Sequence, residues 1–169
     1  VKYREGFIKN RYIGRTFIMP GQTLREKSVR RKLNAIDLEF RKKNVLLVDD
    51  SIVRGTQLKD TVRRLFDYGA REIHMRPACP PLVYGCKFLN FSRSKSEMDL
   101  AGRRAIKELG EPDDVSLTEY ATYGTDKYNA MVDRIRHRLG LTSLRYQKLE
   151  DLVDAIGLPK EKLCTYCWD

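Results

Sequence analysis

Residues 45–57, VLLVDDSIVRGTQ, decide the fold of this 169-residue chain, because a strand pattern changes there into a helical one. Residues 45–48 are all aliphatic, which predicts a strand buried on both faces of a parallel sheet with covering helices. From Thr56 onward the apolar residues recur at helical spacing, which predicts a helix that ends at Gly69. These apolar residues are Leu58, Val62, Leu65 and Phe66. The turn between them offers hydroxyls and backbone N–H groups at a helix start, where anions bind. We therefore expect an α/β fold with a phosphate site at this turn.

Two adjacent carboxylates, Asp49 and Asp50, end the predicted strand. Like charges side by side repel, and an ordinary turn rarely needs both. We expect one carboxylate to accept hydrogen bonds from a sugar diol and the other to hold Mg²⁺, directly or through water, beside a pyrophosphate. The alternative is that Asp49, Asp50 and Ser51 only cap the following helix.

A basic segment precedes the strand and surrounds a Pro20-Gly21 turn signal. Its cations are Lys9, Arg11, Arg15, Arg25, Lys27, Arg30, Arg31 and Lys32. We expect a hairpin-like loop at about residues 9–32 that closes over a polyanionic substrate and stabilises the charge of the leaving group. A solvated basic surface is the alternative, because charge runs are usually that.

The remaining pattern continues the α/β reading. Residues 72–76 predict a second strand parallel to the first, with ligands at the carboxyl edge of the sheet. Residues 77–94 are irregular, and Ser96 with Asp99 should cap a helix that ends near Leu109. Residues 111–124 form a connection. Beyond it we expect a helix at 126–139, a short strand at 144–146 and a last helix from residue 149 to Gly157. We place a boundary between residues 1–140 and a helical tail, 141–169.

The composition bounds the partners and the location. No apolar run is long enough to span a membrane and no signal peptide is present, so we expect a cytoplasmic protein. The formal net charge of +10 raises nucleic acid as a partner. However, no zinc finger, RNA-binding aromatic strand or helix-turn-helix pattern accompanies that charge, which disfavours nucleic acid.

Four cysteines form two pairs, Cys79 with Cys86 in the irregular stretch and Cys164 with Cys167 in a CTYC motif. In a cytosolic chain this spacing indicates metal or redox chemistry more than a structural disulfide. Two pairs would suffice for tetrahedral Zn²⁺ or an iron–sulfur cluster, although for Cys79 we favour the alternative of a small buried apolar residue. The two histidines, at positions 74 and 137, are poor acid–base candidates because their patterns predict satisfied or solvated side chains.

These motifs resemble a known family. Residues 45–57 resemble the phosphoribosyl pyrophosphate (PRPP) signature of the type I phosphoribosyltransferases. Residues 4–34, REGFIKNRYIGRTFIMPGQTLREKSVRRKLN, resemble the flexible catalytic loop of the amidophosphoribosyltransferases, the glutamine-dependent enzymes that open purine synthesis. The cysteine spacing resembles their iron–sulfur subclass, and the resemblance runs along essentially the whole chain.

The resemblance implies roles for individual residues. Asp49 and Asp50 would bind the ribose hydroxyls and the Mg²⁺ of PRPP. The loop around the 5′-phosphate would be Ser51, Ile52, Val53, Arg54, Gly55 and Thr56, and Gln57 departs from the small hydroxyl residue usual there. The catalytic-loop candidates are Lys9, Arg11, Tyr12 and Arg15.

The same resemblance implies a cofactor. Cys86, Cys164 and Cys167 match three ligands of a [4Fe-4S] cluster, with zinc as the alternative metal. The fourth family ligand lies in a part of the enzyme that this chain lacks. Cys79 is then a bystander or a substitute ligand, and we favour the bystander. Such a cluster would attach the tail to the loop instead of transferring electrons.

The implied fold is a type I phosphoribosyltransferase-like parallel sheet with flanking helices, lacking its first strands, followed by a C-terminal helical tail. The implied reaction converts PRPP, glutamine and water to 5-phosphoribosylamine, glutamate and pyrophosphate. Because the glutaminase domain and the early transferase strands are missing, we expect the C-terminal part of such an enzyme: an engineered piece, a proteolytic remnant or one piece of a split enzyme. We also expect a homo-oligomer that purine nucleotides could inhibit.

Three other functions compete with this one. A non-catalytic PRPP-fold regulator would need a nucleic-acid-reading element. A nucleobase salvage transferase would share the PRPP signature but not the cysteines. A metal-stapled nucleic-acid-binding module would bind duplexes in a salt-sensitive way without responding to PRPP.

Overall fold

The computed structural model describes residues 3, 6–9, 33–88 and 99–169. Its first elements are the strands β1 (Phe7–Lys9) and β2 (Leu33–Ala35), which pair antiparallel, and the short helix α2 (Asp37–Phe40). Three of the catalytic-loop candidates, Arg11, Tyr12 and Arg15, lie outside the described residues, as does the side chain of Lys9. Their role in catalysis therefore stays a prediction.

A parallel sheet forms the centre of the fold, with strand order β3-β4-β5. Its strands are β3 (Asn44–Asp49), β4 (Glu72–Pro77) and β5 (Ser143–Leu144). Because Asp49 pairs in register with Pro77, β3 and β4 end at the same edge of the sheet. The two predicted strands and their parallel pairing are confirmed, while the third strand lies one residue earlier than predicted and is shorter.

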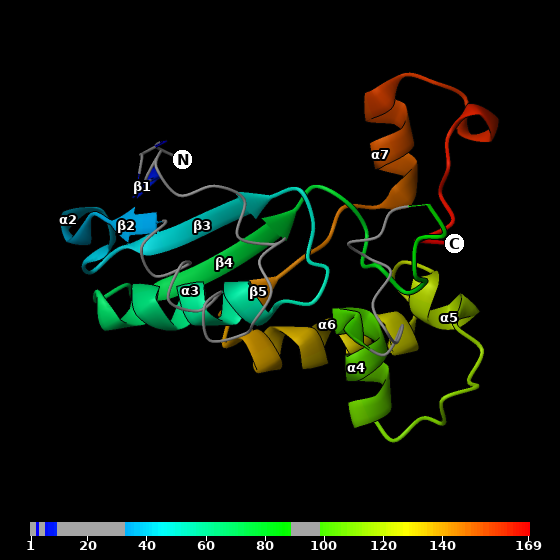
Figure 1. Ribbon diagram of the computed structural model, residues 1–169, viewed down its shortest axis with the longest axis horizontal. Coiled ribbons are helices and arrows are strands. Elements are labelled where there is room, and N and C mark those ends of the chain that lie inside the picture. The colour runs from blue at the N-terminus through cyan, green and yellow to red at the C-terminus, as the bar shows by residue number, and fades with distance from the viewer. Residues whose placement is uncertain (1–2, 4–5, 10–32, 89–98) are drawn as a thin grey trace.

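Two helices cover one face of this sheet. The helices α3 (Thr56–Asp67) and α6 (Asp126–Leu139) lie together along that side (Figure 1), against the buried side chains of Ile73 and Met75. On the opposite face, Leu46 is 43% exposed and Val48 is 72% exposed. The prediction that this strand is buried on both faces is therefore wrong for the described structure, because its helices pack on one face only.

The helix α6 follows its sequence prediction to the residue. Thr125 caps it by accepting a hydrogen bond from the backbone N–H of Tyr128 at 3.1 Å, and Gly140 ends it with φ +72°. Met131, Ile135 and Leu139 are buried, as the periodicity predicts.

Three local predictions need correction. The helix α4 (Ala101–Glu108) begins after Leu100 without a side-chain cap, because the Asp99 carboxylate accepts instead from Arg104 at 2.8 Å; Ser96 lies outside the described residues. A short helix, α5 (Thr118–Ala121), lies within the predicted connection. Phe66 at the end of α3 is 39% exposed and so leaves the buried stripe.

The chain ends in a helical tail, as predicted, with α7 (Leu149–Ile156) and the 3-10 turn η3 (Lys160–Lys162). β5 pairs with β4 although it follows residue 140, and the boundary placed there stays a prediction. No helix in the described part of the chain is both long and apolar enough to cross a membrane.

Candidate functional site

The carboxylate pair lies at the carboxyl edge of the sheet, where β3 ends. The backbone N–H of Asp50 donates to Asp49 Oδ1 at 3.0 Å, and Ser51 Oγ donates to Asp50 Oδ1 at 3.0 Å. The backbone carbonyl of Asp49 accepts from Ala78 N–H at 2.8 Å, which fixes this end of β3 to the residue after β4. Both carboxylates are exposed and therefore available to a ligand.

The alternative role of the pair as a helix cap is excluded. The N-cap residue of α3 is Gly55, which has no side chain to cap the helix. Asp49, Asp50 and Ser51 thus precede the helix start by several residues. Helix capping therefore does not account for the two exposed carboxylates.

The turn after the carboxylates is held in place by contacts with the protein core and with α4. Ile52 is only 4% exposed and anchors the turn in the core, and Val53 O accepts a hydrogen bond from Ala101 N–H at 2.8 Å. Gly55 has φ +74°, and a Cβ there would lie 2.9 Å from Leu139 Cδ2. Both the left-handed conformation and the close approach of α6 require glycine at this position.

The first turn of α3 is open to an anion. Its carbonyl at Gly55 accepts the first helical bond from Lys59 at 2.9 Å, and the turn contains no acidic residue. In the part of the chain that the structure describes, no side chain caps the N–H groups at this helix start. With the hydroxyls of Ser51 and Thr56 close by in sequence, the turn can donate several hydrogen bonds to one phosphate.

Cys79 is buried close enough to Asp50 to sense its charge. Its side chain is 8% exposed, and burial together with the negative charge of Asp50 raises the pKa of its thiol to about 11. A thiol with such a pKa stays protonated at neutral pH in the absence of a metal. Cys79 therefore behaves as the small buried residue that the sequence left open. Its proximity to Asp50 could not have been inferred from spacing.

The C-terminal cysteine motif folds back onto the irregular stretch after β4. Cys167 O accepts from the backbone N–H groups of Val83 at 3.1 Å and of Tyr84 at 3.3 Å. The ring centroids of Tyr84 and Tyr166 are 5.8 Å apart. Burial, and then the charge and hydrogen bond of Cys86, raise the pKa of the Cys167 thiol to about 11. The structure thus brings Cys86 and Cys167 together.

No three His, Cys, Asp or Glu side chains among the described residues are arranged to hold one metal ion. The exposed Asp pair still fits Mg²⁺, which is usually bound by one or two carboxylates together with substrate phosphates and water. The tail thiols fit a thiophilic metal in their donor chemistry.

The two histidines lie in other settings. His74 contacts Ser143 Oγ at 2.8 Å and Glu72 Oε2 at 3.1 Å, and His137 contacts Asp133 Oδ2 at 3.3 Å. Both histidine side chains thus have polar partners, in agreement with the prediction that they are satisfied or solvated.

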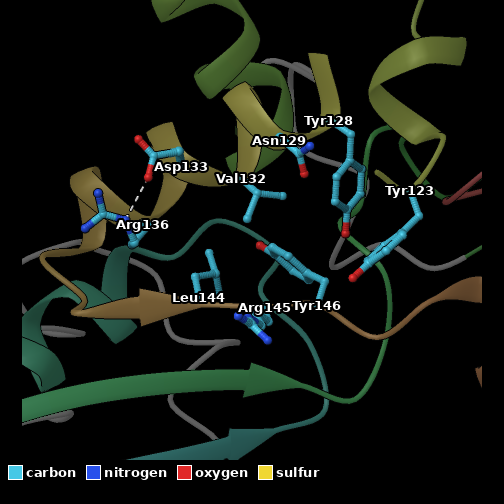
Figure 2. A pocket seen from close by; sticks show the side chains of 9 residues that line it. All are labelled: Tyr123, Tyr128, Asn129, Val132, Asp133, Arg136, Leu144, Arg145 and Tyr146. Carbon is cyan, nitrogen blue, oxygen red and sulfur yellow. Dashed lines mark hydrogen bonds and ion pairs between the residues drawn. The ribbon is translucent and has the colours of Figure 1, made fainter. Parts of the chain in front are cut away.

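A pocket of about 260 Å³ lies between α6 and the chain around β5. Figure 2 shows Tyr128 and Val132 of α6 facing Leu144 and Tyr146 across it. The buried hydroxyls of Tyr128 and Tyr146 have no hydrogen-bond partner within the described residues. The Asp pair does not line this pocket.

The parallel sheet with helices packed on it, and the Asp pair and turn at its carboxyl edge, match the type I phosphoribosyltransferase fold. One solved structure with this architecture, the glutamine PRPP amidotransferase of B. subtilis complexed with ADP and GMP, superposes with a TM-score of 0.67 at 32% identity, over 98% of this chain and 31% of that one. The chain belongs to the amidophosphoribosyltransferase family.

Curated relatives show the same kinship. The amidophosphoribosyltransferase of Pseudomonas aeruginosa is 41% identical over 163 residues, which is 96% of this chain and 27% of the relative. That of Escherichia coli is 44% identical over 158 residues, covering 91% of this chain and 25% of the relative. No family model matches the chain. The chain thus spans between a quarter and a third of the length of these relatives.

Proposed function

We propose that this chain forms the PRPP-binding part of an amidophosphoribosyltransferase, which converts PRPP, glutamine and water to 5-phosphoribosylamine, glutamate and pyrophosphate. The observation that carries the proposal is the exposed Asp49–Asp50 pair beside the uncapped start of α3, in a chain 41% identical to a curated enzyme of that name. Glutamine hydrolysis and the complete PRPP site would involve segments of the parent enzyme beyond this chain.

The geometry supports a proposed role for each part of the site. The N–H groups at the start of α3, with Ser51 and Thr56, hold the 5′-phosphate. Asp49 and Asp50 accept hydrogen bonds from the ribose hydroxyls and hold Mg²⁺. Bound Mg²⁺ would neutralise charge on the pyrophosphate that leaves. The protein therefore positions the substrate and stabilises charge, and supplies no nucleophile.

The basic segment is proposed as the catalytic loop. Lys9 of β1 pairs with Leu33 of β2, so the chain leaves and re-enters the described structure at neighbouring points, as a hairpin-like loop requires. Within that loop, the proposed residues that act on the pyrophosphate are Lys9, Arg11, Tyr12 and Arg15. Their positive charge suits the negative charge that grows on the leaving group.

The tail cysteines are proposed as metal ligands. Cys86, Cys164 and Cys167 would hold a [4Fe-4S] cluster, or zinc, with a further ligand from the parent enzyme. The contact between Cys86 and Cys167 and the backbone bonds to the Cys167 carbonyl support this proposal. The metal would keep the tail on the loop.

The assembly and control of the parent enzyme are also proposals. We propose a cytoplasmic homo-oligomer that purine nucleotides inhibit. The structural relative from B. subtilis, complexed with ADP and GMP, supports nucleotide binding in this family.

The test measures PRPP binding by calorimetry in the longest natural form of this polypeptide. Asp50→Asn keeps the size of the side chain and removes its charge, and Asp67→Asn makes the same change at an exposed position at the end of α3. We expect Mg²⁺-dependent binding by the wild type and by Asp67→Asn, and its loss in Asp50→Asn. Undiminished binding by Asp50→Asn would reject the assignment of the carboxylates.

A further inference from the structure

The first turn of α4 contacts residues 51–56, which we call the phosphate turn. None of the residues proposed to bind the substrate lies in α4. Its first residue, Ala101, is 5% exposed, and its backbone N–H donates to Val53 O at 2.8 Å. Val53 lies between the buried Ile52 and the left-handed Gly55, so this hydrogen bond fixes the middle of the turn.

The same turn of α4 is wedged from its other side. A Cβ at Gly102 would lie 2.8 Å from the carbonyl oxygen of Leu82 and 3.4 Å from Met131 Sδ. Glycine at this position therefore lets the helix approach both the loop after β4 and α6. The Leu82 carbonyl belongs to the backbone and cannot move away as a flexible side chain can. It therefore limits the distance between α4 and the loop after β4.

The loop against which α4 packs is itself held by the C-terminal tail. Val83 is fully buried, and its N–H and that of Tyr84 donate to Cys167 O. A continuous set of contacts thus runs from the tail through residues 82–84 and the start of α4 to Val53.

We propose that Ala101 and Gly102 are positioning residues for the phosphate turn, and that they couple its position to that of the C-terminal tail. This inference rests on the proposed function, because the ligand of the turn is the 5′-phosphate of PRPP. Neither residue touches the substrate. They act by holding Val53 where the N–H groups at the start of α3 converge on one anion.

The test is Ala101→Pro. Proline is well tolerated at the first position of a helix, and Leu100 already has φ −63° and ψ 140°, which suits a residue before proline. The substitution removes the N–H that binds Val53 and places ring atoms there. Asp126→Pro is the matched control, because Asp126 is the first residue of α6 after an extended Thr125.

Binding of two ligands is measured by calorimetry in the longest natural form of the polypeptide: ribose 5-phosphate, and pyrophosphate with Mg²⁺. We expect Ala101→Pro to bind ribose 5-phosphate at least about tenfold more weakly, since misplacement by about 1 Å at a site can cost up to 10²-fold. Pyrophosphate binding should stay unchanged, because a loss of folding would weaken both ligands together. Asp126→Pro should bind both as the wild type does.

A second variant approaches the turn through Gly102. Gly102→Ala leaves the N–H of Ala101 in place but moves α4 away from Leu82, and it should also weaken ribose 5-phosphate selectively. Equal ribose 5-phosphate binding in the wild type and both variants would overturn the positioning role alone. Absence of ribose 5-phosphate binding in the wild type would overturn the proposed function itself. Parallel losses for both ligands would assign these residues to stability only.

Discussion

Gly55→Ala tests how tightly α6 packs against the phosphate turn. Gly55 has φ +74°, a conformation that costs alanine roughly 1–2 kcal/mol. The new Cβ would also lie 2.9 Å from Leu139 Cδ2, and overpacking of this kind costs about 1–3 kcal/mol. The reduced entropy of the unfolded chain returns about 0.4–1 kcal/mol. We expect a loss of about 1–5 kcal/mol in the free energy of unfolding, centred on about 3 kcal/mol.

Gly124→Ala separates the two causes. Gly124 has φ +86°, but nothing lies within 4 Å of a Cβ placed there. This control should lose only about 1 kcal/mol, because it carries the backbone term without the contact. Urea unfolding followed by circular dichroism gives both values.

A double-mutant cycle with Leu139→Ala then tests the contact itself. Leu139→Ala alone should cost about 2–5 kcal/mol through the cavity it leaves. In that background, the added cost of Gly55→Ala should fall to that of Gly124→Ala. If Gly55→Ala costs no more than the control in the wild-type background, or if the cycle shows no coupling, the packing argument is refuted.

Three further predictions concern a cap, a thiol and the metal. Thr125→Ala removes the acceptor for the N–H of Tyr128 and should cost about 1 kcal/mol in urea unfolding; an unchanged midpoint would contradict the cap. Because the pKa of Cys79 is raised from 9.0 to about 11, the folded state holds this proton more tightly, so stability should fall as the pH rises from 9 to 11, and Cys79→Ala should make that fall shallower. A slope equal to that of the wild type would contradict this. Cys164→Ser should lower the iron or zinc content of anaerobically purified protein while Cys79→Ser retains it; the reverse result would make Cys79 the ligand.

Local sequence patterns were enough for the elements that surround the turn. The aliphatic run at 45–48, the spacing from Leu58 to Leu65 and the stripe of Met131, Ile135 and Leu139 predict β3, α3 and α6, because strand and helix periods differ. Adjacency in the chain also sufficed for the carboxylates and the phosphate turn, since a strand end and the next helix start are covalently joined.

Contacts between distant segments were beyond the sequence. Nothing in the spacing indicates that Leu139 packs against Gly55 or that the N–H of Ala101 binds the carbonyl of Val53. The same is true of the proximity of Cys79 to Asp50. The exposure of Val48 likewise depends on which face of the sheet the helices cover, and the aliphatic run does not determine that face.

The sequence by itself determined the class of fold and the position of the carboxylate pair and the following turn at the end of a strand, because contiguous motifs specify both. The tertiary structure decided how the turn is held: by an N–H from α4, a side chain from α6 and, through residues 82–84, the carbonyl of Cys167. Such contacts join segments far apart in the chain, and only packing in three dimensions determines which of them meet.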